Sequence, residues 1–196
     1  MRLNWGMKIF FALVVPLFLI VSQGCSTKYT IKAPDYQGYK GEINQHNRLI
    51  KAEKSRIFQI LTQDESYKNI CPPGTIVTYE PPLPYQAGTI VRTNIDHIFK
   101  LEWRSQVEEV VPDSKIRLRF LNGFFSGGLE FWELENEGDH TRVRQTIIVQ
   151  PKGVIRKIFW NVKVRLKHNI MVEEFLDNLK RIAEGTDKNP YVRAQY

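Results

Sequence analysis

Histidine and cysteine are the side chains in this chain whose chemistry suits metal binding or nucleophilic catalysis, but their spacing favours neither. A metal site needs clustered ligands. The four histidines are instead scattered along the chain, at His46, His97, His140 and His168. Cys71 has no histidine close to it in sequence, and a free cysteine is most often a small buried hydrophobe. The sequence therefore predicts no metal ion and no other cofactor.

General acid–base chemistry is the catalytic role that the sequence leaves open. Asp96 and His97 adjoin the end of an expected strand, and His168 lies on an expected helix. A histidine in an apolar pocket can transfer a proton near neutral pH. More often such a histidine simply makes one hydrogen bond. We therefore expect a protein without enzymatic activity and keep catalysis as the alternative.

The segment from Lys152 to Lys167, where cations are mixed with large apolar side chains, suggests contact with a membrane. Cations suit anionic lipid headgroups, and tryptophan sits readily at a membrane interface. The alternative is a solvated helix whose apolar side packs on a sheet. Phe124 and Phe125, on a strand connection, have two interpretations as well: a tip that touches lipid or a buried plug. The membrane-contact candidates are Arg156, Lys157, Phe159, Trp160 and Lys163.

Hydrophobic periodicity predicts the elements that position these residues. A strand over residues 43–50 is followed by helices over 52–63 and 64–70. Further strands follow, and a helix without proline runs from about 154 to 184. Short loops between consecutive strands predict an antiparallel meander. The strands of this meander are expected at residues 75–79, 88–95, 100–111, 115–121, 129–134 and 141–149.

The apolar stripe of the last helix changes side part-way along. One stripe runs through Ile155, Phe159, Val162, Leu166 and Ile170. The other stripe, on roughly the opposite side, contains His168, Met171, Val172, Phe175, Leu179 and Ile182. A straight helix packed on one sheet needs only one stripe. We therefore expect either a bend near residues 167–170 or a first half that buries a second face against something else.

Residues 1–24 have the features of a secretory signal peptide. Arg2 and Lys8 supply a positive flank, the next stretch is uncharged and apolar, and small and polar residues lead to Cys25. A retained membrane anchor is the alternative, although the apolar stretch is shorter than the ~20 residues of a spanning helix and contains Pro16. The sequence thus predicts export from the cytoplasm.

Cys25 resembles the lipidated cysteine of bacterial lipoproteins, because a glycine precedes it and a serine follows it. Ser22 departs from that pattern, which usually has leucine at this position. A lipidated Cys25 would attach the mature chain to a membrane of the cell envelope, on its periplasmic or extracellular side. An ordinary cleaved signal is the alternative. Residues 25–41 would then form a tether, and residues 186–196 are expected to form a flexible tail.

Charge and cysteine content limit the remaining classes of protein. The chain has 28 Lys and Arg against 21 Asp and Glu, and removal of residues 1–24 removes Arg2 and Lys8, leaving 26 against 21, or +5. This modest excess suits anionic lipid headgroups and is too weak and dispersed to indicate nucleic-acid binding. Cys71 is the only cysteine besides Cys25, so the domain has no internal disulfide and its core must hold the fold. We expect a monomer.

Four stretches of the chain carry a family resemblance: HNRLIKAEKSRIFQILTQDESYKNI (46–70), GTIVRTNI (88–95), RSQVEEVVPDSKIRLRF (104–120) and EEFLDNLKRIAEG (173–185). Over residues 42–185 the chain resembles the START-like SRPBCC superfamily, in its polyketide cyclase/dehydrase and lipid-transport branch. These motifs are architectural, so they specify the fold better than the function. Lys51, where many members have a small residue, and the proline-rich insertion after Tyr79 depart from the family pattern.

The resemblance implies an α+β helix-grip fold, in which a curved antiparallel sheet wraps around the long C-terminal helix and leaves an elongated apolar cavity. It also implies a domain that binds a hydrophobic small molecule or lipid. The alternatives are a cyclase or dehydratase using the same cavity and an envelope interaction module without a ligand; plain core packing is the alternative for each lining residue. The expected lining is Trp103, Phe120, Phe131 and Gln145 on strands and Val164, His168, Met171 and Phe175 on the helix, with Arg92, Asn94 or Gln145 orienting the ligand.

Overall fold

The structure is a computed structural model that describes residues 36, 38–81, 83–96 and 100–186. The expected signal peptide, Cys25, His97 and nearly all of the expected tail lie outside the described residues. The folded domain begins at Gly38. None of the helices in the described part of the chain is long and apolar enough to cross a membrane.

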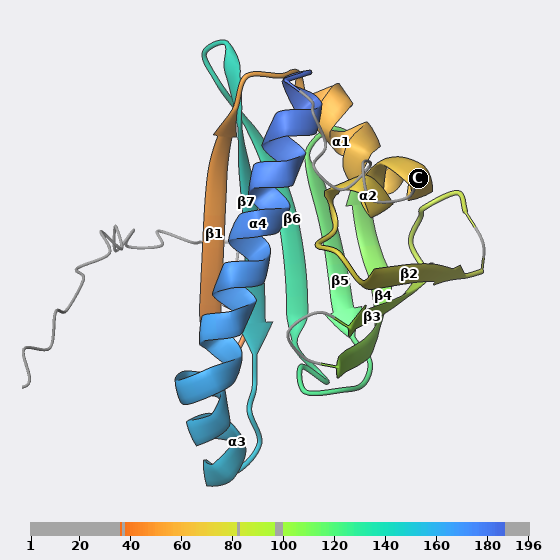
Figure 1. Ribbon diagram of the computed structural model, residues 1–196. Coiled ribbons are helices and arrows are strands. Elements are labelled where there is room, and N and C mark those ends of the chain that lie inside the picture. The colour runs from red at the N-terminus through yellow and green to blue at the C-terminus, as the bar shows by residue number, and fades with distance from the viewer. Residues whose placement is uncertain (1–35, 37, 82, 97–99, 187–196) are drawn as a thin grey trace, which may run out of the picture. The chain divides into compact units, whose positions relative to one another are not determined.

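Antiparallel strands form one seven-stranded sheet in the order β1-β7-β6-β5-β4-β3-β2. The strands β2 and β3 run across the direction of β1 and β7, so the sheet curls toward one face (Figure 1). The predicted meander is confirmed, and the first strand is added beside the last one. The bounds are β1 Glu42–Ile50, β2 Thr75–Glu80, β3 Ile90–Asp96, β4 Lys100–Val111, β5 Lys115–Phe120, β6 Leu129–Glu137 and β7 His140–Val149.

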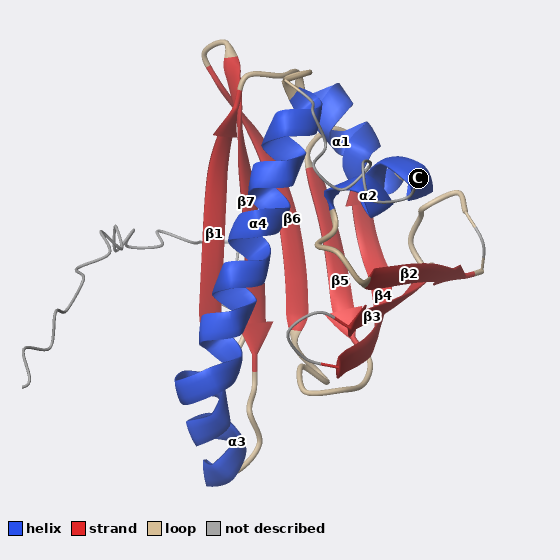
Figure 2. Ribbon diagram, in the orientation of Figure 1, coloured by secondary structure: helices blue, strands red, loops and turns tan. Residues whose placement is uncertain are grey.

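The helices cover one face of this sheet. The long helix α4 lies across it, and α1 and α2 lie near the C-terminal end of α4 (Figures 1 and 2). This is the expected α+β architecture, with a curved sheet around a long C-terminal helix. The helical bounds are α1 Lys54–Thr62, α2 Asp64–Ile70, α3 Val154–Phe159, the π-helical turn η2 Trp160–Val164 and α4 Arg165–Ala183.

Alternating side chains give the strands an inner and an outer face. On β5, three buried apolar residues alternate with three cations, and those cations pair with Glu108 and Glu109 of β4. The register between β4 and β5 shifts between Val107 and Glu109. Such a bulge allows two successive glutamates to meet cations on the outer face. The inner face is thereby left to mainly apolar side chains.

The C-terminal helical segment is continuous, but its backbone departs from α geometry at the turn Trp160–Val164. The N–H of Arg165 donates there to the carbonyl of Trp160, five residues back. A single π turn of this kind shifts the side chains that follow it relative to those before it. The change in the helix thus comes before the bend that the two apolar stripes predicted at residues 167–170.

The main core lies beneath the second half of this segment. Val172, Leu176 and Leu179 of α4 pack there with Ile50 of β1 and Ile57 of α1. The second predicted stripe is therefore the one that faces the sheet. Gly185, with a φ of 67°, ends the helix as expected, because glycine adopts this left-handed backbone at little cost.

Candidate functional site

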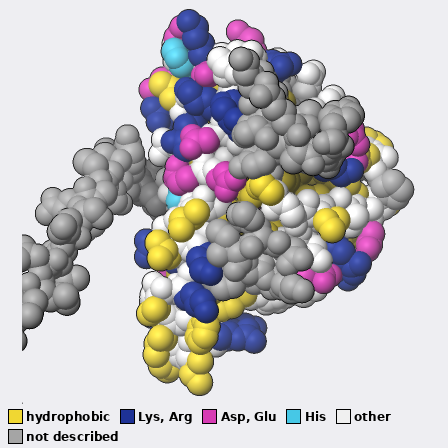
Figure 3. Space-filling model, viewed as in Figure 1, with side chains coloured by type: hydrophobic (Ala, Val, Ile, Leu, Met, Phe, Trp, Pro, Cys, Tyr) yellow, Lys and Arg dark blue, Asp and Glu magenta, His cyan; other side chains and the backbone are white. Residues whose placement is uncertain are grey.

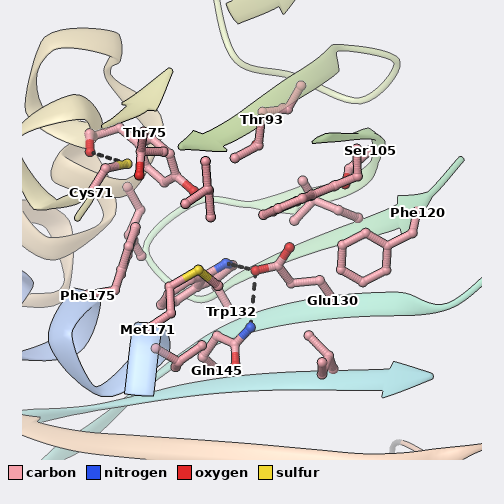
Figure 4. A pocket seen from close by; sticks show the side chains of 18 of the residues that line it. Cys71, Thr75, Thr93, Ser105, Phe120, Glu130, Trp132, Gln145, Met171 and Phe175 are labelled. Atoms are coloured by element: carbon pink, nitrogen blue, oxygen red, sulfur yellow. Dashed lines mark hydrogen bonds between the residues drawn. The ribbon is translucent and has the colours of Figure 1, made fainter. Parts of the chain in front are cut away.

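A cavity lies between the inner face of the sheet and the helices α2 and α4. The volume that the centres of water molecules can occupy inside it is about 80 Å³. The whole space between the lining atoms, including the open mouth, is about 910 Å³. Since one water needs about 10–15 Å³ on the first of these measures, the cavity has room for several waters or one small molecule. Figure 4 shows the lining side chains converging from the strands and from α4.

Several residues predicted from the sequence come together at this cavity. On β4, β5 and β7 they occupy inward positions of the alternating pattern. On α4 they lie on or beside the stripe that faces the sheet. Strand and helix periodicity are therefore sufficient to find this part of the lining. The expected residues that line the cavity are Trp103, Phe120, Gln145, His168, Met171 and Phe175.

Arg92 and Asn94, expected to orient a ligand, lie on the outer face of β3. The cavity is lined from this strand by Val91, Thr93 and Ile95, and side chains alternate along a strand. Arg92 pairs with Glu102 of β4 at 3.5 Å. The expectation failed because β3 has polar residues on both faces, so its alternation alone does not identify the inner one.

Phe131 and Val164 also lie outside the cavity lining. Phe131 is buried on the outer face of β6, where its ring meets that of Tyr39 edge to face with centroids 5.8 Å apart. Val164 packs against a separate aromatic cluster that contains Trp160. The strand LEFWEL has apolar residues on both faces. Because side chains alternate along a strand, an inward Phe131 would imply that Glu130 points outward, which is not the case.

Glu130 is the residue of this site that the sequence reasoning missed. It lies on β6 and points into the cavity (Figure 4). Its Oε1 accepts hydrogen bonds from the indole Nε1 of Trp132, at 3.0 Å, and from the amide Nε2 of Gln145, at 3.2 Å. Gln145 is opposite Trp132 in the register of β6 and β7. A buried glutamine on the inner face, which needs a polar partner, was the one signal available.

The surroundings of Glu130 alter its acidity and that of two tyrosines. Burial raises the pKa of Glu130, and the hydrogen bonds from Gln145 and Trp132 only partly oppose this. Burial also raises the pKa of Tyr67 and Tyr85, and the negative charge of Glu130 raises both further. These two phenols therefore lie close enough to the carboxyl group to interact with it.

Polar atoms without partners occur elsewhere in the lining of the same cavity. Gln145 is 2% exposed, and its Oε1 has no hydrogen-bond partner among the described residues. The hydroxyl oxygens of Thr75 and Ser105 also line the cavity, and the described part of the chain gives them no partner either. Buried polar atoms are nearly always hydrogen-bonded, so these three atoms are positions at which a partner is expected.

Cys71 lines the cavity as a buried thiol, as expected. Its Sγ donates to the carbonyl of Tyr67 at 3.2 Å, and burial raises the pKa of this thiol to about 12. A thiol of this kind is a poor nucleophile at neutral pH. Within residues 36, 38–81, 83–96 and 100–186, no three His, Cys, Asp or Glu side chains form a group that could hold a metal ion.

His168 connects the cavity to a polar network between α4 and β1. Its Nδ1 lies 3.0 Å from Oδ1 of Asn44, which is also 2.9 Å from Nε2 of His46. His46 reaches Glu173 on the other side, at 2.6 Å. Burial and the nearby His46 lower the pKa of His168 to about 3. A histidine with this pKa is neutral near pH 7, so it is poorly suited to carry a proton.

The fold, with its curved sheet and long C-terminal helix, resembles that of solved structures. A protein from Thermus thermophilus is 20% identical with a TM-score of 0.58, over 75% of this chain and 100% of that one. The Aha1 dimer from Colwellia psychrerythraea is 18% identical with a TM-score of 0.57, and the match covers 73% of this chain and 96% of that one. Norcoclaurine synthase from Thalictrum flavum, in complex with dopamine and hydroxybenzaldehyde, is 12% identical with a TM-score of 0.57. This match covers 76% of this chain and 90% of that one.

The fold is that of the helix-grip proteins. At such low identities the likeness to these SRPBCC and Bet v1-like structures shows the fold alone. No family model matches the chain, and no curated protein matches its sequence. The chemistry of this helix-grip domain therefore has to be argued from its own residues.

A second feature of the helix-grip domain is the apolar surface at the start of its last helix, called here the α3 ridge. The helix α3 contains no buried residue, and Arg156, Lys157 and Lys163 are exposed around it. Figure 3 shows hydrophobic side chains gathered at this end of the domain, with cations beside them. The α3 ridge consists of the exposed residues Val154, Ile155, Ile158, Phe159, Val162, Leu166 and Ile170.

Trp160 corrects one expectation for this segment, because it points inward. It is 1% exposed, whereas its neighbour Phe159 is 52% exposed. Its indole packs against Phe124, Phe125 and His168, with ring centroids 6.3 to 6.4 Å apart. Phe125 is buried in the same cluster, so of the two interpretations of this aromatic pair the structure supports the plug.

Proposed function

We propose that the helix-grip domain binds a small hydrophobic molecule in the cavity between its sheet and α4. The observation that supports this most is the composition of the lining: aromatic and aliphatic walls with a few polar groups, among them Glu130 and Gln145. Ligand sites typically combine an apolar enclosure with a few polar groups that fix orientation. Burial of apolar ligand surface contributes roughly 25 cal/mol per Å².

A cavity-filling variant tests this proposal. Ser105→Phe adds a ring at an inward position of β4, whereas Gln106→Phe, at the next position, adds the same ring on the outer face. Organic extraction of the purified protein followed by mass spectrometry should recover a ligand from the wild type and from Gln106→Phe. Ser105→Phe should carry less of it. Recovery of the same amount from all three proteins, or of none from any, would contradict the proposal.

We propose further that the chain is exported and anchored to a membrane through a lipid on Cys25, with the α3 ridge resting on that membrane. The exposed apolar side chains and the six cations among residues 152–167, a stretch without Asp or Glu, support contact with anionic lipid. Each cation near such a surface contributes about 1 kcal/mol of attraction at low salt. A single acyl chain binds only marginally, so a second contact would matter.

Vesicle binding tests the ridge separately from the anchor. The chain from residue 26 onward should sediment with phosphatidylglycerol vesicles at low salt, and much less with phosphatidylcholine vesicles. Replacing Ile155 and Phe159 by serine should reduce this binding. Ile76→Ser is the matched control, because Ile76 is a 62% exposed apolar residue on β2. Equal binding by all the variants would remove the ridge from the proposal.

Metabolic labelling with a fatty acid tests the anchor. The wild type should incorporate the label, and Cys25→Ser should not.

A second candidate function is catalysis at Glu130, in a cyclase- or dehydratase-type reaction. The specific observation in its favour is that Glu130 lines the cavity together with Tyr67 and Tyr85 and has a raised pKa, because such a carboxyl group can act as a general acid. Incubation with small aromatic and polyketide-like carbonyl compounds, followed by mass spectrometry, tests it. Turnover by the wild type and none by Glu130→Gln would favour this function over simple binding.

A further inference from the structure

The hydrogen-bonding groups around Glu130 are not balanced. Trp132 Nε1 and Gln145 Nε2 both donate to Oε1 of Glu130, and Figure 4 shows the second carboxyl oxygen directed away from these two donors. Gln145 Oε1 has no partner among the described residues. The orientation of this amide is fixed by Glu130, because the reversed amide would bring two acceptor oxygens together. The cavity therefore presents acceptors that need donors.

The charge of the cavity is not balanced either. Among the residues whose side chains the structure describes, no lysine and no arginine lines the cavity. The other titratable groups in the described lining are the phenols of Tyr67, Tyr79 and Tyr85, the thiol of Cys71, and His168. Ionised Glu130 is thus a negative charge without a positive partner in the lining. A buried charge of this kind is unfavourable unless it is paired.

The walls around the carboxyl group are aromatic. Three phenol rings, two indoles and three phenylalanine rings line the same cavity. Aromatic faces attract cations, and the attraction is largest when the cation is removed from water. The Glu130 end of the cavity therefore has the features of a site for an organic cation: a carboxylate, a further acceptor and aromatic rings.

We propose that the ligand of this cavity is an organic amine, with an ammonium group on Glu130 Oε2 and an apolar or aromatic body along the sheet. This inference rests on the proposed ligand-binding function and names the chemical class of the ligand. An ammonium N–H group donates a hydrogen bond to Oε2, and the positive charge of the ammonium group balances the carboxylate. The available volume limits the ligand to a small amine.

Titration calorimetry with two molecules of nearly equal shape tests this assignment. The probes are 2-phenylethylamine, a cation at neutral pH, and 2-phenylethanol, which is uncharged. The wild-type chain should bind the amine about ten to a hundred times more tightly than the alcohol, the range expected for a buried hydrogen bond to a charged group. Glu130→Gln keeps the shape of the side chain and should bring the two affinities within about threefold of each other.

The matched control is Glu133→Gln, on the outer face of the same strand, where Glu133 lies near Arg144. It should leave the ratio of the two affinities unchanged.

The pH profile provides a test that needs no variant. The pKa of Glu130 is raised above the ordinary 4.5, so binding of the ammonium group displaces a proton at low pH, and amine affinity should increase as pH rises above about 4.5.

Two failures of the experiment have different meanings. Equal affinities for the alcohol and the amine, with no dependence on pH, would overturn the assignment of an amine and leave the proposed binding function intact. Binding of neither probe, by the wild type and by Ser105→Phe alike, together with no ligand recovered by extraction, would overturn the binding function itself.

Discussion

The two halves of the last helix contain similar apolar side chains but occupy opposite environments. From Val172 to Ala183, α4 buries its apolar stripe against the sheet, α1 and α2. From Val154 to Leu166, the stripe is exposed to solvent, and the exposed fraction of Ile155 is 76%. Burial is the usual reason for an apolar stripe on a helix. The first half therefore has a stripe that folding of this domain does not explain, which is why a contact outside the domain is proposed for it.

The neighbours Phe159 and Trp160 provide the strongest test of this comparison. Trp160→Ala should destabilise the fold by about 3–5 kcal/mol, because it removes a fully buried indole from an aromatic cluster. Phe159→Ala should change the free energy of unfolding by less than about 0.5 kcal/mol, because the ring is largely exposed. Urea denaturation of both variants measures these values. A large loss of stability in Phe159→Ala would show that the ridge is part of the folded core.

The sequence was sufficient to predict the fold and part of the site, and it failed where a local pattern fits two structures. Helix and strand periodicity located Phe120, Gln145 and Phe175 because their elements have one apolar face. On β6 both faces are apolar, so Phe131 was predicted to point inward and Glu130 was not considered. Which face of this strand is inner depends on its register with β7, a tertiary property that no local pattern contains.

The same limit explains the error at Trp160. A helical wheel treats the segment as a regular α-helix, and the π turn at Trp160–Val164 changes which side chains share a face. Basic residues beside aromatic ones correctly indicated an unusual surface. They did not show which of the two adjacent aromatic rings points outward, because that depends on contact with Phe124 and Phe125.

The pH dependence of stability should be specific to the buried half of the helix. His168 has a pKa of about 3 in the folded protein, against about 6.5 in an unfolded chain. Between these values the unfolded chain binds a proton that the folded protein does not, so acid favours unfolding. The contribution is about 1.4 kcal/mol for each pH unit below about 6.

Urea denaturation at pH 7, 6, 5 and 4 tests this dependence. The wild type should lose stability toward acid more steeply than His168→Gln, which has no proton to bind at this position. His140→Gln, at the start of β7, is the control and should keep the steep profile. Parallel profiles for the wild type and His168→Gln would show that the histidine titrates normally in the folded protein.

The polar network on α4 provides the smallest expected effect. Glu173 is 2.6 Å from Nδ1 of His46 and 2.6 Å from Arg48, which also meets Asp177 at 3.0 Å. The Glu173 side chain is 46% exposed, so water screens these ion pairs. Glu173→Gln should therefore destabilise the fold by only about 1 kcal/mol, and Arg156→Gln on the α3 ridge by less than about 0.5 kcal/mol.

Thermal denaturation of these two variants, beside Trp160→Ala, ranks the forces that hold the helix. If packing fixes the buried half, Glu173→Gln lowers the melting temperature by a few degrees at most, and high salt reduces the difference from the wild type. A loss as large as that of Trp160→Ala would mean that the bonds from β1 to α4, rather than the apolar stripe, select which half of the helix lies on the sheet.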